Sequence, residues 1–207
     1  QTRTGFPKNL GAMALAASLV LSGCVNNTEG GPAGGEGNNE AIEVSKSEAA
    51  AKLVPADLAE RGVLKVGTDA TYAPNQYAGP DGKPIGWEVE LVEAVAAKLD
   101  LEVEWQKSGF DQIIPRVDGG TLDLGSSSFS DTVERQKSVD FVDFYNAGLQ
   151  FVRGADEKEL TDDLCGLKIG AQATTTSDDY LTAKSKECEA AGKPPIQILK
   201  KDGQDEA

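Results

Sequence analysis

Three short apolar segments alternate with two amphipathic segments in the middle of this 207-residue chain. The apolar segments, at 63–67, 101–105 and 122–125, have the length and composition of buried strands. The segments between them, at 88–99 and 111–118, are predicted helices, the first with apolar residues at helical spacing. This order predicts an α/β fold built on an open parallel sheet. In such sheets a ligand binds beyond the carboxyl ends of the strands.

A second α/β unit is expected after a change of composition near residue 153. Residues 168–171 and 196–199 are predicted strands and residues 178–191 a predicted helix, while a further strand at 149–153 leads into the unit. Only about fifty residues are available for it, too few to close a stable core alone. We therefore expect a second lobe that is incomplete, in a chain truncated at its C-terminal end.

The start of the chain has the features of an export signal. Arg3 and Lys8 precede an apolar run at 10–21 that is too short to span a membrane as a helix. The run ends in the quartet Leu-Ser-Gly-Cys, which resembles the bacterial lipobox. Residues 1–23 are therefore a predicted lipoprotein signal peptide, and Cys24 is the predicted site of lipidation. A plain signal peptide with an incidental cysteine is the alternative.

The next segment, 24–52, is rich in Gly, Asn and Glu and has few apolar residues to bury. This composition predicts a disordered tether between a membrane anchor and the folded part. The folded part is divided into a first lobe at 53–152 and a second lobe at 153–207. We expect a monomer that is lipid-anchored on the extracytoplasmic face of the cell membrane.

Charge and residue usage exclude several classes of function. The chain has 34 acidic and 20 basic residues, and its formal charge of −14 argues against binding of nucleic acid. The absence of histidine removes Ser-His-Asp and Cys-His catalysis and all histidine metal sites. In an exported chain, Cys165 and Cys188 predict a disulfide. Two cysteines without histidine supply too few soft ligands for a metal site.

Hydroxyl side chains and one arginine follow the third predicted strand, in the stretch LDLGSSSFSDTVERQKSVDF. Serine hydroxyls supply adaptable hydrogen-bond donors, and small residues let backbone N–H groups approach a ligand. The guanidinium of Arg135 presents a planar fork that matches a carboxylate in two parallel hydrogen bonds. The stretch predicts a pocket for an α-carboxylate, and an ordinary Ser-rich loop beside a solvated arginine is the alternative.

Four motifs between residues 64 and 199 resemble the polar-amino-acid family (family 3) of bacterial extracellular solute-binding proteins, which serve ABC transporters. They are LKVGTDATYAPNQYAGPDGKPIGWEVELVEAVAAKL, GFDQIIPRV, SSSFSDTVERQKSVDF and GLKIGAQATTTSDDYL, in this order. The resemblance implies a type II periplasmic-binding-protein-like fold, whose two lobes close on a free amino acid. It implies delivery of that ligand to the permease subunits of an importer, and it implies no enzyme activity, no cofactor and no metal.

The same resemblance implies which residues contact the ligand. Arg135 would bind the α-carboxylate, and Thr176 and the backbone around Thr175 would complete that site from the second lobe. The other implied contacts, to the α-ammonium group or to the ligand's side chain, come from Asp69, Tyr72, Phe110, Ser127, Ser128, Ser130 and Gln172. Read without the resemblance, Tyr72 and Phe110 are core residues, Asp69 is a helix cap or turn former, and the turn at 172–177 caps the next helix.

The chain departs from the family pattern at three positions. Thr174 stands where the family usually has glycine. If the turn requires a positive φ, this threonine would be strained, because its side chain is β-branched. Glu88 replaces an aspartate one methylene shorter, and Asp131 occupies a commonly apolar place beside Arg135.

Two other functions remain open on this fold. Some extracytoplasmic dehydratases that act on arogenate or prephenate share it, and for such an enzyme Glu88 and Asp69 are the visible candidates for a general acid or base. A ligand-sensing domain of a receptor is the other alternative. For a binding protein, Asp69 favours a polar or cationic ligand such as glutamine, arginine or lysine.

Overall fold

The computed structural model describes residues 44–157 and 159–207, so the predicted signal peptide, Cys24 and most of the predicted tether lie outside the described residues. The tether prediction is wrong for the last residues before 53. The short helix α1 (Glu48–Ala51) forms there, capped by the side chain of Ser47. The Ser47 N–H also donates to the carbonyl of Lys98 at 2.9 Å, which joins this segment to the first lobe.

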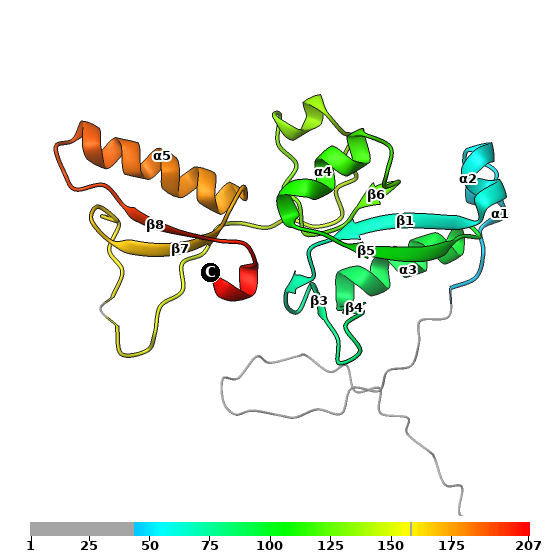
Figure 1. Ribbon diagram of the computed structural model, residues 1–207, viewed down its shortest axis with the longest axis horizontal. Helices are drawn as coiled ribbons and strands as arrows, with labels where there is room; N and C mark the ends of the chain where they lie inside the picture. The colour runs from blue at the N-terminus through cyan, green and yellow to red at the C-terminus, as the bar shows by residue number, and fades with distance from the viewer. Residues whose placement is uncertain (1–43, 158) are drawn as a thin grey trace, which may run out of the picture. The chain divides into compact units, whose positions relative to one another are not determined.

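A parallel three-stranded sheet forms the centre of the first lobe, as the sequence predicts. Its order is β5 (Glu102–Lys107), β1 (Val63–Thr68) and β6 (Leu124–Gly125). The connections between these strands contain α3 (Trp87–Lys98) and α4 (Phe110–Asp118), which Figure 1 draws on opposite sides of the sheet. The predicted strand at 122–125 is shorter than expected. All three strands end at the edge where the candidate site residues begin.

Burial along β1 explains why this strand occupies the middle position. Val66 is fully buried, and Leu64 packs with Ala96 of α3 and with Leu101 before β5. The preceding helix, α2 (Ala56–Arg61), ends at Gly62, whose φ of 68° suits a glycine C-cap. Apolar burial of this kind supplies most of the stabilisation of a small α/β sheet.

A small antiparallel sheet follows β1 and precedes α3. It contains β2 (Thr71–Tyr72), β3 (Gln76–Ala78) and β4 (Pro84–Ile85). A tight turn at Asp81 and Gly82 joins β3 to β4, and Gly82 takes a φ of 80° there. This sheet brings Asn75 and Gln76 to the loop that follows β6.

The second lobe contains the parallel pair β7 (Lys168–Gln172) and β8 (Gln197–Lys201), with α5 (Thr176–Ala190) as the crossover. Its buried cluster includes Leu164, Ala171, Leu181 and Ile196. The predicted disulfide between Cys165 and Cys188 is confirmed, and it ties the segment before β7 to the end of α5. The short 3₁₀ helices η1 (Arg135–Lys137) and η2 (Gln204–Glu206) complete the set of elements.

The predicted strand at 149–153 is wrong. Residues 139–154 form no regular secondary structure, and Val152 keeps 88 % of its surface exposed. A strand needs a neighbouring backbone to accept and donate its hydrogen bonds, and no described segment pairs with this one. Apolar composition alone therefore gave a false signal.

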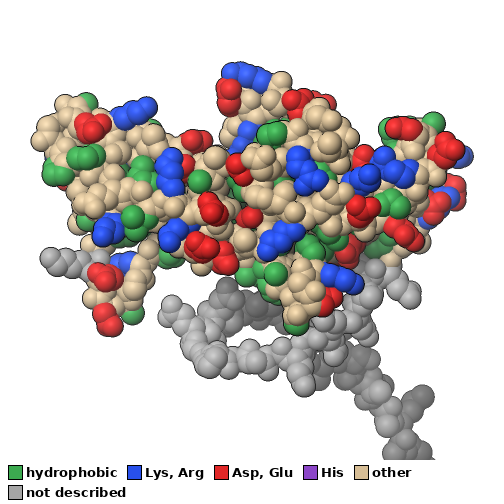
Figure 2. All heavy atoms as spheres, in the orientation of Figure 1, with side chains coloured by type: hydrophobic (Ala, Val, Ile, Leu, Met, Phe, Trp, Pro, Cys, Tyr) green, Lys and Arg blue, Asp and Glu red, His purple; other side chains and the backbone are tan. Residues whose placement is uncertain are grey.

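Acidic and basic side chains are interspersed over the face of the molecule that Figure 2 shows. Within residues 44–157 and 159–207, no helix has both the length and the apolar character needed to cross a bilayer.

Candidate functional site

The loops that follow β1, β5 and β6 meet at the carboxyl edge of the first-lobe sheet. The Asp69 N–H, after β1, donates to the hydroxyl of Ser127, after β6, at 3.1 Å. Phe110 begins α4 after β5, and its ring stacks on Phe129 with 4.3 Å between the ring centroids. The structure thus brings three predicted site residues together, as expected for loops at one edge of a parallel sheet.

Arg135 lies where this edge meets the turn before α5. Its Nη1 donates to the carbonyl of Ser130 at 2.8 Å, and its Nη2 donates to the carbonyl of Thr174 at 3.2 Å. Its guanidinium carbon lies 5.5 Å and 5.3 Å from the ring centroids of Phe110 and Phe129, within cation–π range. Burial lowers the pKa of Arg135 below its usual range, although the negative charge of Asp179 raises it. The guanidinium stays charged, because an arginine in a protein does not lose its proton.

The hydroxyls of Ser127 and Ser128 are engaged by protein groups. Ser128 Oγ donates to Glu88 Oε2 at 2.7 Å and accepts from Asn75 Nδ2 at 2.9 Å. Ser127 Oγ accepts from Asp69 N and from Gln76 Nε2. An ammonium group would therefore meet backbone carbonyls of this loop more readily than these hydroxyls.

Asp69 is a buried carboxylate with neutral donors around it. It keeps 7 % of its surface exposed, and it accepts from the hydroxyl of Thr71 and from Gln172 Nε2, the latter at 2.8 Å. Gln172 is itself buried, and its Nε2 also donates to the carbonyl of Asp202 at 2.9 Å. The two residues thus form a polar contact between segments 103 residues apart.

The turn between β7 and α5 is a helix cap, as one interpretation of the sequence proposed. Thr175 is the N-cap of α5, and its hydroxyl accepts from Asp178 N and donates to the carbonyl of Gln172 at 2.7 Å. Thr176 Oγ1 lies 3.2 Å from the hydroxyl of Ser130. Thr174 has a φ of 63°, so the position where the family usually has glycine does adopt the left-handed conformation here.

Two aromatic residues of the prediction have different environments. Phe110 is 8 % exposed and belongs to the buried set, whereas Tyr72 on β2 is 41 % exposed, which excludes a core role for Tyr72. Phe129 was not singled out from the sequence, although its position among four serines could have indicated it. The roles of Asn75, Gln76 and Asp178 had no local signal, because each depends on a partner distant in the chain or on a specific backbone conformation.

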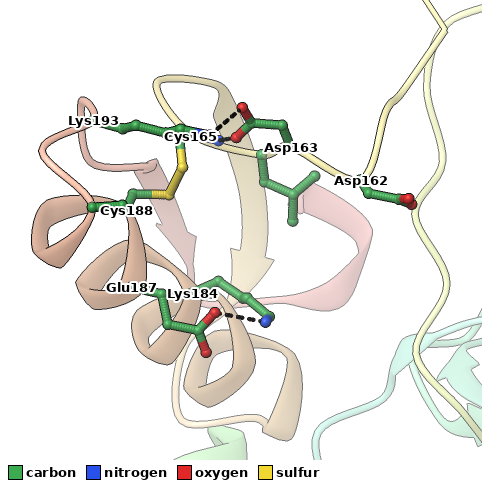
Figure 3. A pocket seen from close by; sticks show the side chains of 9 residues that line it. Asp162, Asp163, Cys165, Lys184, Glu187, Cys188 and Lys193 are labelled. Carbon is green, nitrogen blue, oxygen red and sulfur yellow. Dashed lines mark hydrogen bonds and ion pairs between the residues drawn. A yellow bond between two sulfur atoms is a disulfide. The ribbon is translucent and has the colours of Figure 1, made fainter.

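A separate cavity of about 360 Å³ lies beside the disulfide of the second lobe (Figure 3). Four of its five charged side chains form two ion pairs, Lys193 with Asp163 and Lys184 with Glu187. The hydrogen bond from Lys193 holds the pKa of Asp163 below its usual range. The cavity shares no residue with the predicted ligand contacts. Within the described residues, no group of acidic or cysteine side chains is arranged to hold a metal ion.

The four sequence motifs lie within the part of the chain that matches a known protein family. The family described as bacterial extracellular solute-binding proteins, family 3, matches residues 64–206. The chain belongs to this family. Its partial two-lobe α/β architecture is that of type II periplasmic binding proteins.

Individual relatives are binding proteins for amino acids. The chain is 39 % identical over 188 residues to the arginine-binding protein ArgT of Corynebacterium glutamicum, which covers 89 % of this chain and 61 % of the relative. It is 31 % identical over 147 residues to an L-arginine-binding protein of Pseudomonas aeruginosa, covering 70 % and 54 %. The chain thus spans about half to three-fifths of the length of these curated relatives.

Solved structures of amino acid-binding proteins are also similar to this chain. An ancestral arginine-binding protein bound to arginine superposes with a TM-score of 0.59 at 33 % identity, covering 70 % of this chain and 63 % of that one. An ancestral amino acid-binding protein, a precursor of cyclohexadienyl dehydratase, gives a TM-score of 0.62 at 31 % identity, covering 73 % and 66 %.

Proposed function

We propose that this chain is the ligand-capturing part of a substrate-binding lipoprotein of an ABC importer. It takes up a polar or cationic amino acid between its two lobes and delivers it to the permease subunits in the membrane. The observation that carries the proposal is the position of Arg135, which contacts the loop after β6 and the turn before α5 at once. A carboxylate bound there would be held by groups from both lobes.

The chemistry of the α-carboxylate site follows from the donors around it. The guanidinium has five N–H donors, and its two described hydrogen bonds use two of them. The backbone N–H groups at the start of α5 favour an anion, because the first turn of a helix has unpaired donors. Thr176 adds a hydroxyl from the second lobe and Ser130 one from the first.

The chemistry around Asp69 favours a cationic side chain on the ligand. Its carboxylate is buried, and its described partners, Thr71 and Gln172, are neutral donors. A buried negative charge gains most from a positive partner, since the surroundings screen it poorly. The names of the relatives point to the same class, and we propose arginine as the first ligand to test, with lysine and glutamine next.

The lipid anchor is a separate part of the proposal. Cys24 would carry the lipid after removal of residues 1–23 and hold a monomeric binding protein on the extracytoplasmic face of the membrane. Fractionation of cells that express the full-length protein tests this. The wild type is expected in the membrane fraction and Cys24→Ala in the soluble extracytoplasmic fraction. An equal distribution of the two would contradict lipidation.

A dehydratase is the second candidate, because one structural neighbour is a precursor of such an enzyme. The structure offers few groups that could act as its general acid or base. Glu88 is 1 % exposed and accepts from Ser126 Oγ and from both the N–H and the hydroxyl of Ser128, so its oxygens are engaged by the protein and are not presented to a substrate. Asp69 remains as a single acid. Formation of product from arogenate or prephenate would favour the dehydratase over the binding protein.

A thermal-shift panel of the twenty amino acids tests the proposed function, with the protein expressed without residues 1–24 and otherwise complete. A ligand present at 100 times its dissociation constant adds about 2.7 kcal/mol to the free energy of unfolding. We expect a shift with arginine and with few other amino acids. A folded protein that shows no shift with any of the twenty would overturn the proposal.

A further inference from the structure

Two buried carboxylates have the same local arrangement, one in each lobe. Glu88, in the first turn of α3, is 1 % exposed, and Asp178, in the first turn of α5, is 4 % exposed. Each accepts the backbone N–H of a residue in the left-handed conformation. Ser128 N donates to Glu88 Oε1 at 3.0 Å, and Thr174 N donates to Asp178 Oδ2 at 3.1 Å.

The left-handed conformation costs free energy for a residue with a Cβ atom, and it costs most for a β-branched residue. Ser128 has a φ of 51° and Thr174 a φ of 63°. These conformations persist only where surrounding groups compensate for the strain. The hydrogen bond to a buried, charged acceptor supplies such compensation in both places.

The two strained residues lie in the loops that hold Arg135. The carbonyl of Thr174 itself accepts from Arg135 Nη2, and the carbonyl of Ser130, two residues after Ser128, accepts from Arg135 Nη1. A change of φ at Thr174 or at Ser128 would redirect these carbonyls. The guanidinium would then lose the contacts that set its orientation.

Both carboxylates have further donors that fix them in place. Asp178 Oδ2 pairs with Lys200 Nζ of β8 at 2.8 Å. Glu88 accepts from the hydroxyls of Ser126 and Ser128, both at 2.7 Å. The contacts of Glu88 tie the loop at 126–130 to α3, and the ion pair of Asp178 ties the start of α5 to β8. Neither carboxylate is itself one of the predicted ligand contacts.

We propose that Glu88 and Asp178 are positioning residues of the amino-acid site, each holding a left-handed loop residue so that backbone carbonyls orient Arg135. This inference rests on the proposed function for its ligand, but not for its backbone geometry. It gives Glu88 a role in holding Ser128, and it explains why threonine is tolerated at position 174, where glycine is usual.

A glycine rescue in the second lobe tests the proposal. Asp178→Ala is expected to weaken binding of L-arginine about tenfold, because Thr174 then relaxes from its strained conformation. Glycine adopts a positive φ freely, so Asp178→Ala combined with Thr174→Gly is expected to bind within about threefold of Thr174→Gly alone. Thr174 is exposed, so its truncation opens no cavity. Glu189→Ala, an exposed acid on the same helix, is the matched control and should bind as the wild type does.

A conservative replacement of Glu88 in the first lobe provides a second test of the proposal. Glu88→Gln keeps a carbonyl oxygen for Ser128 N and is expected to bind L-arginine at least about threefold more tightly than Glu88→Ala does. Circular dichroism and thermal unfolding identify variants that have lost the fold. Wild-type affinity in Asp178→Ala, or a folded Asp178→Ala that the glycine does not rescue, would overturn the inference.

Amide hydrogen exchange separates this inference from the proposed function. Without ligand, the Thr174 N–H of Asp178→Ala should exchange faster than that of the wild type or of Glu189→Ala, because it has lost its acceptor. Failure of the wild type to bind any amino acid would contradict the proposed function alone. Unchanged exchange at Thr174 would contradict the positioning role, whatever the ligand is.

Discussion

Arg135 makes two kinds of contact that a fully solvated arginine would lack. Two backbone carbonyls fix the plane of its guanidinium, and the rings of Phe110 and Phe129 cover it. Carbonyl acceptors leave the positive charge unneutralised, and Asp179, whose charge acts on the guanidinium, forms no described ion pair with it. The residue is therefore held in place with its charge available for an anion.

Replacement of Arg135 by alanine should abolish most of the binding of the ligand. Loss of charge-assisted hydrogen bonds is expected to cost more than about 2 kcal/mol, which corresponds to a loss of about thirtyfold in affinity. Arg135→Lys should also bind poorly, because an ammonium group lacks the planar fork. Lys137→Ala, an exposed cation two residues away, is the control. Titration calorimetry measures all three, and wild-type affinity in Arg135→Ala would refute the site.

The sequence carries a signal for the backbone of Thr174 but none for that of Ser128. A glycine is usual at position 174, so a positive φ was the condition under which threonine would be strained, and the structure has a positive φ there. Serine at 128 carries no such signal, because its conformation depends on Glu88, 40 residues earlier in the chain. Local patterns identify strands and hydroxyl-rich loops, but they do not identify the distant acceptor that a loop uses.

The junction between β4 and α3 depends on a glycine for two independent reasons. Gly86 has a φ of 129°, and a Cβ atom added there would collide with the backbone of Asn75. Gly86→Ala should therefore destabilise the protein by about 3 kcal/mol, through overpacking together with backbone strain. Gly82→Ala is the matched control, because Gly82 also has a positive φ but has open space around it. It should cost only about 1 kcal/mol in urea denaturation.

The disulfide between Cys165 and Cys188 closes a loop that contains β7 and most of α5. The two cysteines are 23 residues apart in the sequence. In the chain-entropy model, a cross-link over this distance stabilises the folded state by about 3 kcal/mol. The double variant Cys165→Ala, Cys188→Ala should therefore unfold at lower urea concentration by that free energy. A reducing agent should destabilise the wild type but not the double variant. Equal stability of the oxidised wild type and the variant would contradict a structural role.

Elements with strong periodicity were predicted well, and elements that depend on a partner were not. The 88–99 helix and the buried strand β1 follow directly from apolar spacing. The segment at 149–153 has the same apolar composition as a strand, but no described backbone lies beside it to complete the hydrogen bonds. The strands of the small sheet β2–β3–β4 are too short for an alternating pattern of apolar and polar residues to reveal them.

Across the whole described chain, side-chain hydrogen bonds join the first lobe to the second. Gln172 Nε2 donates to Asp69, the hydroxyls of Ser130 and Thr176 are paired, and Gln204 N donates to the hydroxyl of Thr71. Four of these residues, Asp69, Gln172, Ser130 and Thr176, are also predicted ligand contacts. A ligand that enters between the lobes would therefore exchange contacts with groups that bind one another in its absence.

The bond between Asp69 and Gln172 makes this exchange measurable. Because its acceptor is charged and buried, a double-mutant cycle with Asp69→Ala and Gln172→Ala should give a coupling energy of about 1.5–3 kcal/mol in the absence of ligand. The exposed pair Lys184 and Glu187 is the control and should give about 0.5 kcal/mol or less. With saturating L-arginine, the Asp69–Gln172 coupling should fall, because the ligand's cation competes with Gln172 for the same carboxylate. A coupling that arginine leaves unchanged would mean that Asp69 joins the lobes without contacting the ligand's side chain.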